Sequence, residues 1–246
     1  MNTPDPCRRP HAAASLPAFR LLLLFLLAAA SAARAAQPLA TDDAAVVTPK
    51  TCQLEVWNRS VHGAQALWAQ PACNFTGNLE LSFGGARARS DAGESSTIVA
   101  LQAKTVLAAS DDGAASFGML AGAGRETAAP HGRSAFQSYY AKALASWYPR
   151  DDLEFDINLG VANTYGTGTF ALAGAAVQYA IARNVQLLAE AFRDEPRGGR
   201  YQVGARYILV LDRFEAYASY GNRLDSSTDD WSAIIGVRLQ TDAFLP

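Results

Sequence analysis

The sequence predicts an all-β protein, an antiparallel up-and-down transmembrane β-barrel with about 12 strands, ten being the alternative count. Three observations predict this fold: apolar and polar residues alternate with a period of two in many short segments, no apolar stripe persists at helical spacing, and the polar faces carry charges of both signs. The 246 residues are 50% hydrophobic and 18% charged. Such a composition excludes a disordered chain and a basic nucleic-acid-binding protein.

The N-terminus has the pattern of a secretory signal peptide, predicted over residues 1–35. Arginines precede the apolar block 21–30, and the small-residue site Ala33-Arg34-Ala35 follows it. The alternative is an N-terminal membrane helix, but the apolar block is too short to span a bilayer. We therefore expect export, which permits disulfide bonds.

The exported chain would carry 17 basic and 22 acidic side chains, a net charge of −5. This balance gives no reason to expect a nucleic-acid partner. Residues 36–50 are rich in Ala, Pro and Thr without periodicity and predict a flexible periplasmic leader. Cys52 and Cys73 flank the first predicted hairpin, where they either form a disulfide or lie as two small apolar residues.

The remainder, residues 51–246, is the predicted barrel domain. In residues 152–162, for example, Leu153, Phe155, Ile157, Leu159 and Val161 lie on one face and Glu154, Asp156 and Asn158 on the other. Similar alternation predicts strands over 77–84, 96–107, 200–211, 213–223 and 231–240. Weaker alternation predicts further strands over 51–57, 65–70, 114–124, 136–147, 169–181 and 184–192.

Two stretches invite a helical interpretation. Residues 135–147 are rich in Ala, but they also alternate in period two, which favours a strand. Residues 157–182 contain no charge, as a membrane helix would, but a polar run at 163–169 divides them into two alternating halves. A hairpin accounts better for this stretch.

Alternation alone does not distinguish a soluble sandwich from a membrane barrel with its apolar face in lipid. Charges mixed with Gly and Gln favour a confined lumen in which opposite signs pair. The candidate lumen-facing residues are Glu80, Lys104, Lys142, Glu154, Asp156, Glu190, Arg206, Glu215 and Arg238. We expect an ion-paired, plugged interior or a narrow polar channel rather than a wide pore.

Two further features favour the membrane barrel. Aromatic residues lie near the ends of the apolar faces, as in the interfacial girdles of membrane barrels, although they could also be core aromatics. They are Tyr139, Trp147, Tyr201, Tyr207, Phe214, Tyr220 and Trp231. Short turns such as 149–151, 183–184 and 212–213 alternate with longer loops at 125–133, 194–199 and 224–230.

No catalytic, cofactor-binding or metal-binding residues emerge, and we expect no enzymatic activity. After the signal, His62 and His131 are the only histidines in the sequence, and neither has an evident nucleophile or metal-ligand partner. The acidic stretches 111–113 and 225–230 do not follow calcium-loop spacing and suggest turns.

The beginning of the predicted mature chain resembles that of proteobacterial outer-membrane barrels of the transporter-like group associated with phenol meta-pathway operons for aromatic degradation. The resemblance rests on Pro38-Leu39-Ala40-Thr41-Asp42-Asp43, followed by Gln53-Leu54-Glu55 in the first strand. It implies an outer-membrane location and passage of hydrophobic compounds, and it offers no catalytic residues. One departure is the C-terminus, where Phe244 is followed by Leu245-Pro246 and is out of phase with the last strand.

The sequence thus predicts an outer-membrane protein that contacts outer-membrane lipid and the barrel-assembly machinery, with no cofactor. Its expected function is passive transport of small or hydrophobic compounds or a structural role in the envelope. The alternatives are a secreted, soluble periplasmic β-domain that binds a partner and a barrel-borne lipid-modifying enzyme.

Overall fold

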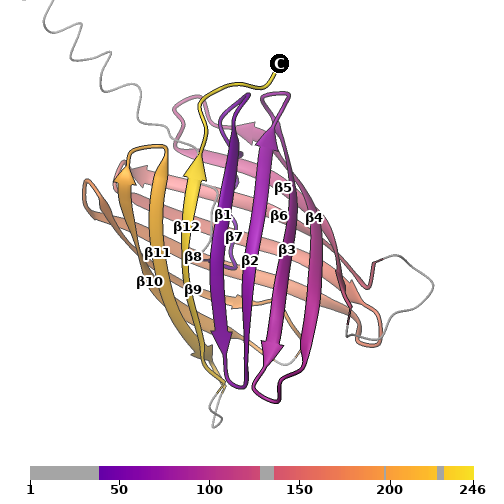
Figure 1. Ribbon diagram of the computed structural model, residues 1–246. Helices are drawn as coiled ribbons and strands as arrows, with labels where there is room; N and C mark the ends of the chain where they lie inside the picture. Colours follow the sequence, from indigo (N-terminus) through magenta and orange to yellow (C-terminus); the bar gives the residue numbers. More distant parts are fainter. Residues whose placement is uncertain (1–38, 128–135, 197, 226–229) are drawn as a thin grey trace, which may run out of the picture. The chain divides into compact units, whose positions relative to one another are not determined.

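The computed structural model describes residues 39–127, 136–196, 198–225 and 230–246, so the predicted signal peptide and His131 lie outside the described residues. Twelve strands make up the described fold (Figure 1). They are β1 (Cys52–Val61), β2 (Ala64–Asn74), β3 (Leu79–Ser90), β4 (Ser95–Ala109), β5 (Ala115–Glu126), β6 (Ser138–Arg150), β7 (Leu153–Thr164), β8 (Gly168–Ala182), β9 (Val185–Arg193), β10 (Arg200–Val210), β11 (Phe214–Arg223) and β12 (Ser232–Gln240). In the described part of the chain there is no helix long and apolar enough to cross a membrane.

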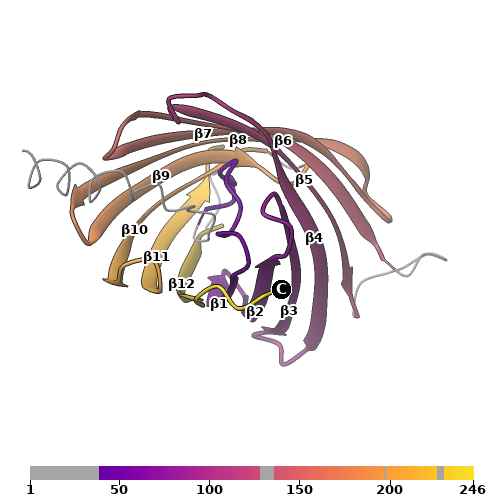
Figure 2. The ribbon, with the colours of Figure 1, turned by 90° about the horizontal axis from the view of Figure 1, so that it is seen from above.

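Each strand pairs antiparallel with its sequence neighbours, and β12 pairs back with β1. The closing register runs from Gln53 opposite Gln240 to Val61 opposite Ser232. Closure leaves no strand edge unpaired, as the views along and across the strands show (Figures 1 and 2). The predicted all-β closed barrel is confirmed, with 12 strands rather than ten.

The alternation in the sequence separates the two faces of the wall. On β7, Glu154, Asp156 and Asn158 are buried inside the barrel. Their neighbours Ile157 and Leu159 point outward and are 54% and 62% exposed. Large apolar side chains cover the outside of other strands in the same way, so the apolar face of this barrel is its exterior.

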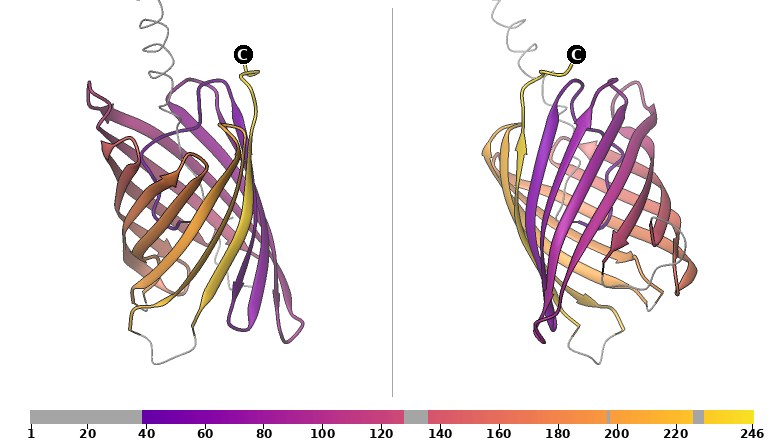
Figure 3. Two further views of the ribbon diagram at one scale, coloured as in Figure 1. Left: turned by 90° about the vertical axis from the view of Figure 1, so that its left-hand side faces the viewer. Right: turned by 45° about the vertical axis from the view of Figure 1, so that its right-hand side comes forward.

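The two ends of the barrel differ in their connections. The end that holds the start of β1 and the end of β12, here called the terminal end, has the short turns at 151–152 and 183–184. The opposite end, the long-loop end, holds the ends of β5, β9 and β11 and the starts of β6, β10 and β12 (Figure 3). Residues 127–137, 194–199 and 224–231 stand between these strands in the sequence.

Exposed aromatic side chains lie near both ends of the outer surface. Trp147 and Tyr207 lie near the terminal end, and Tyr139, Tyr201 and Tyr220 lie nearer the long-loop end. Trp147 stacks on its cross-strand partner Phe155, with ring centroids 5.5 Å apart.

Strand register is irregular only near the terminal end among the described pairings. The shifts fall at Val106/Ala108, Trp147/Arg150, Ala180/Ala182 and Ile208/Val210. β-Bulges of this kind interrupt strict alternation, which explains why sequence periodicity defines these strand ends less well than their centres.

The flexible leader predicted over residues 36–50 stays a prediction, and part of it has a defined place in the structure. Residues 39–47, here called the plug segment, run inside the barrel (Figure 2), where Leu39, Ala44 and Val47 are buried. The lumen supplies hydrogen-bond partners for the segment's backbone, so a stretch without strand periodicity is nevertheless fixed in place.

Cys52 and Cys73 are cross-strand partners in the β1–β2 hairpin and form a disulfide. The bond lies at the terminal end, where the plug segment leads into β1.

We predict that the exported protein has no thiol reactive toward iodoacetamide until it is reduced. Replacing both cysteines by serine should lower the free energy of unfolding by about 3 kcal/mol, the chain-entropy value for a loop of this size. Urea titration with and without reductant measures the change. Alkylation of Cys52 in the unreduced, exported protein would contradict the assignment.

Candidate functional site

The plug segment is held through its backbone by side chains of the barrel wall. Both carboxylate oxygens of Glu190 accept hydrogen bonds, from Ala40 N and Thr41 N, each at 2.8 Å. Asn158 binds Asp42 reciprocally: Asp42 N donates to Asn158 Oδ1 at 2.8 Å, and Asn158 Nδ2 donates to Asp42 O at 2.7 Å.

The second half of the plug segment is anchored in the same manner. Ala44 N donates to Ser146 Oγ, and Val47 N donates to Glu80 Oε2, both at 2.8 Å. Asn74 Nδ2 completes the set by donating to Val47 O at 2.6 Å. These partners come from β2, β3, β6, β7 and β9, so the plug segment crosses the lumen instead of adding a strand to the wall.

Two ion pairs join the acidic residues of the plug segment to the wall. Asp43 Oδ1 lies 2.7 Å from Lys104 Nζ, and Asp42 Oδ2 lies 2.9 Å from Lys142 Nζ. Burial opposes ionisation of Asp42, but Lys142 and Lys104 outweigh it and hold the pKa of Asp42 below its usual value. Asp42 therefore stays ionised at neutral pH and keeps its pair.

Small residues in the wall make room for the plug segment. A Cβ on Gly174 would lie 2.4 Å from Thr41 Oγ1, and one on Gly118 would lie 3.2 Å from the carbonyl oxygen of Ala44. Leu39 packs in a buried apolar cluster with two wall residues, Ala176 and Leu188. The fit therefore combines steric complementarity with polar anchoring.

A second charged cluster fills the lumen near the terminal end. Glu215 lies between two arginines, with Oε1 2.6 Å from Arg238 Nη2 and Oε2 3.5 Å from Arg206 Nε. Arg206 also donates from Nη1 to Gln186 Oε1 at 3.1 Å. Arg206 is only 1% exposed, so its guanidinium is shielded from solvent within this cluster.

All nine residues predicted to face the lumen lie on the inner face, with Lys142 partly buried and the others buried. The plug segment contacts Glu80, Lys104, Lys142 and Glu190. Arg206, Glu215 and Arg238 form the second cluster. Asp156 accepts hydrogen bonds from Ser146 and Gln178, and Glu154 is buried near the terminal end of β7.

Sequence reasoning missed three wall anchors, Ser146, Asn158 and Asn74, because only charged residues were selected as candidates. It also missed the plug segment itself. The adjacent Asp42 and Asp43 in an otherwise uncharged stretch were the available signal, since two neighbouring carboxylates need cationic partners when buried.

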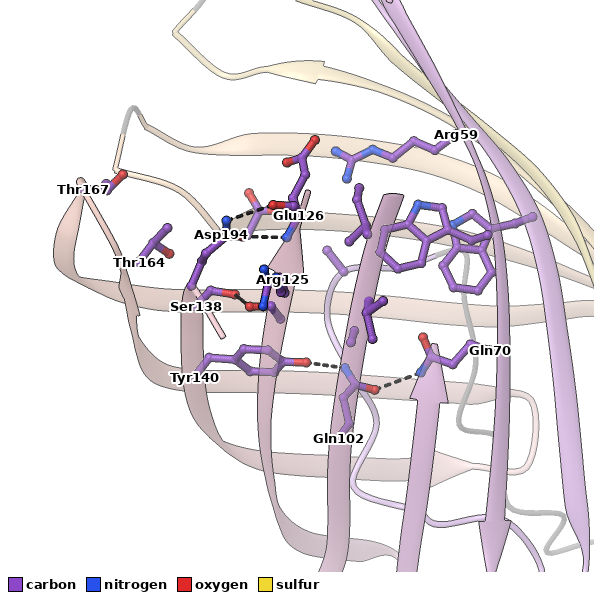
Figure 4. A pocket seen from close by; sticks show the side chains of 18 of the residues that line it. Arg59, Gln70, Gln102, Arg125, Glu126, Ser138, Tyr140, Thr164, Thr167 and Asp194 are labelled. Atoms are coloured by element: carbon purple, nitrogen blue, oxygen red, sulfur yellow. Dashed lines mark hydrogen bonds between the residues drawn. The ribbon is translucent and has the colours of Figure 1, made fainter. Parts of the chain in front are cut away.

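Beyond the plug segment, a cavity of about 650 Å³ reaches the long-loop end; we call it the vestibule (Figure 4). Ala40 of the plug segment lines its inner part. Thr164, Thr167 and Asp194, at or beyond the strand ends on the long-loop side, line its outer part. The plug segment therefore borders the vestibule.

One wall of the vestibule is a polar ladder across three strands. Gln70 Nε2 donates to Gln102 Oε1 at 2.9 Å, and Gln102 Nε2 donates to the Tyr140 hydroxyl at 2.6 Å (Figure 4). The side chains of this ladder donate and accept hydrogen bonds among themselves, and this network holds the wall in a fixed shape.

The lining beside the ladder is aromatic and aliphatic. Trp57 and Trp68 are cross-strand partners whose rings stack at 5.4 Å with an interplanar angle of 1°. Trp57 also packs against Tyr217 and Ile234 in a buried cluster. Both indoles and Ile234 line the vestibule, so this side offers an apolar surface.

Among the residues that the structure describes, no group of three or more His, Cys, Asp and Glu side chains is placed to hold a metal ion. His62 lies in the β1–β2 turn at the long-loop end, away from the plug segment.

Comparison with known proteins places the chain in one family. The family described as "Uncharacterised conserved protein UCP029691" matches residues 23–240, and the chain belongs to it. No curated protein matches the chain.

Among solved structures, a KdgM porin in complex with disordered oligogalacturonate is 11% identical, with a TM-score of 0.60 over 77% of this chain and 99% of that one. A NanC porin is 14% identical, with a TM-score of 0.52 over 76% of this chain and 98% of the other. At these identities the likeness is one of fold: a closed antiparallel barrel of the kind porins have.

We predict that Glu190→Ala loosens the plug segment, because the amides of Ala40 and Thr41 lose their acceptor. Loss of a charge-assisted hydrogen bond should raise amide exchange in residues 39–47 by about tenfold or more. Hydrogen-exchange mass spectrometry measures this, with Glu94→Ala on the exposed β3–β4 turn as control. Unchanged protection of residues 39–47 in the Glu190 variant would show that the anchor is not needed.

Proposed function

We propose that this member of the uncharacterised family is an outer-membrane channel for small molecules, closed in the described state by the plug segment. The observation that carries the proposal is a segment that crosses the lumen beside the vestibule and is anchored there by side chains of five strands. Wall strands are joined by continuous backbone ladders, whereas the plug segment has only separate anchors. It can therefore leave the lumen without opening the barrel.

The outer surface supports a membrane location. Large apolar side chains cover it, and exposed aromatics lie near both ends, as at the two interfaces of a bilayer. A soluble periplasmic β-domain would expose this surface to water. In bacterial barrels short turns face the periplasm, so the terminal end would be periplasmic and the long-loop end extracellular.

Export by the signal peptide and insertion by the barrel-assembly machinery belong to the same proposal. So does the link to aromatic degradation suggested by the N-terminal resemblance, which the tryptophan wall of the vestibule supports. A purely structural envelope role is the alternative, favoured by the dense filling of the terminal half of the lumen.

The channel function is tested by removing the plug segment. A variant lacking residues 39–47 should show stepwise ion conductance in planar lipid bilayers, because the wall anchors would then face water. The wild type should conduct little. Leu159→Ala, which changes only the outer surface, serves as control and should behave like the wild type. Equal conductance of the deletion variant and the wild type would favour the structural role.

The membrane location is tested by opposite substitutions at neighbouring positions of β7. Ile157→Arg would place a charge on the lipid-facing surface and should cost about 2–4 kcal/mol of folding free energy in vesicles. Asp156→Asn should cost less, because it stays inside and retains an acceptor for Ser146 or Gln178. For each variant, the fraction of protein that keeps the mobility of the folded barrel on gels without heating is measured at increasing urea concentrations. The urea midpoint reports the loss of folding free energy.

Equal tolerance of these two changes would contradict the proposed orientation of the wall. Recovery of the wild-type protein in the soluble periplasmic fraction without detergent would contradict the membrane location itself.

A further inference from the structure

Arg59 is the residue of the vestibule that the closed-channel function does not use. It lies on the inner face of β1, two residues beyond Trp57 toward the long-loop end, and Figure 4 shows its side chain at the cavity. Its Nε is shielded from solvent and has no hydrogen-bond partner among the residues that the structure describes.

Among the described residues Arg59 has no counter-ion, and the strand register gives the reason. Its direct cross-strand partners are Ala66 on β2 and Ile234 on β12. Neither can accept a hydrogen bond through its side chain. Elsewhere in the lumen arginines are paired, as Arg206 and Arg238 are with Glu215.

A partly buried guanidinium without an anion is unfavourable, because burial removes water and nothing replaces it. The planar fork of arginine matches a carboxylate in bidentate geometry. Arg59 is therefore suited to hold an acidic group brought by a ligand.

The surroundings of Arg59 limit the rest of the ligand. Trp57, Trp68 and Ile234 form an apolar wall on the same side of the cavity. A flat apolar ring packs well on such a surface. The side-chain amides of Gln70 and Gln102 in the neighbouring polar ladder are already hydrogen-bonded within the ladder.

Two carboxylates in the lining disfavour a second negative charge. Glu126 and Asp194 line the vestibule, and Glu126 accepts a hydrogen bond from Ser96 Oγ at 2.6 Å. A dianion that engaged Arg59 would carry its other charge among Glu126, Asp194 and Arg125, whose net charge is negative and disfavours it.

We propose that the vestibule binds a small monocarboxylate with a flat apolar ring, its carboxylate on Arg59 and its ring against the tryptophan wall. The cavity of about 650 Å³ is large enough for such a compound. The inference rests on the proposed channel function and names the class of molecule that enters it.

The test is isothermal titration of the purified full chain in detergent micelles with benzoate. Benzamide, of the same shape but neutral, should bind about tenfold or more weakly, as expected for loss of a charge-assisted contact. Terephthalate and galacturonate should also bind more weakly than benzoate, because the first is a dianion and the second lacks a flat apolar ring.

Matched variants locate the site. Arg59→Gln should weaken benzoate binding about tenfold or more, whereas Arg87→Gln, the same change at an exposed position on the outer face, should not. Glu126→Gln should bind benzoate at least as tightly as the wild type, because it removes a repelling charge. If Arg59→Gln does not fold, as judged by a gel mobility that changes on heating, Arg59→Lys takes its place. This variant keeps the positive charge but loses the planar guanidinium, so it should also bind benzoate more weakly.

Several results would overturn the inference: equal binding of benzoate and benzamide, unchanged binding by the Arg59 variants, tighter binding of galacturonate or terephthalate, or no binding of benzoate. These results concern ligand class alone. Conductance of the variant lacking residues 39–47 separately decides whether the protein is a channel, so the two proposals fail in different experiments.

Discussion

The structure depends on the confinement of polar groups inside a closed wall. Twelve amphipathic strands turn their apolar side chains outward, so the charged and amide side chains are enclosed together and must find partners there. The nine charged candidates of the wall are five carboxylates and four cations, so their charges do not balance. Two of the cations, Lys104 and Lys142, form their ion pairs with the plug segment and not with another candidate. The plug segment resolves this mismatch, because its carboxylates meet Lys104 and Lys142 while its amides satisfy Glu190 and Glu80.

The same requirement divides the lumen into two regions with different properties. Near the terminal end, the plug segment and the Arg206–Glu215–Arg238 cluster leave the buried groups in contact with one another. Toward the long-loop end the lining is less densely filled and forms the vestibule. A polar ladder and an aromatic wall border this space, and Arg59 lies in it without an anionic partner among the residues that the structure describes. The proposed gate and the proposed ligand site thus lie on either side of the same segment.

The anchoring of the plug segment also connects the two regions. Gln202 lines the vestibule and donates from Nε2 to Glu190, whose carboxylate holds the amides of Ala40 and Thr41. Tyr140 belongs to the polar ladder and also packs against the cluster that contains Ala44. Groups that meet a molecule in the vestibule are therefore directly bonded to, or packed on, groups that retain the plug segment.

The sequence by itself determined the wall. A side-chain period of two is a local property, so Leu153 to Val161 and their polar neighbours could be assigned to opposite faces without knowledge of the other strands. The inward position of residues such as Asp156 and Arg206 follows from that alternation.

Only the tertiary structure decided what fills the lumen. The plug segment has no periodicity, and its partners are distant in sequence: 150 residues separate Ala40 from Glu190. Its position depends on the three-dimensional arrangement of anchors from five strands. Arg59 has no partner among the described residues, because closure of β12 onto β1 brings Ile234 beside it. Neither relation is encoded in any short stretch of the chain.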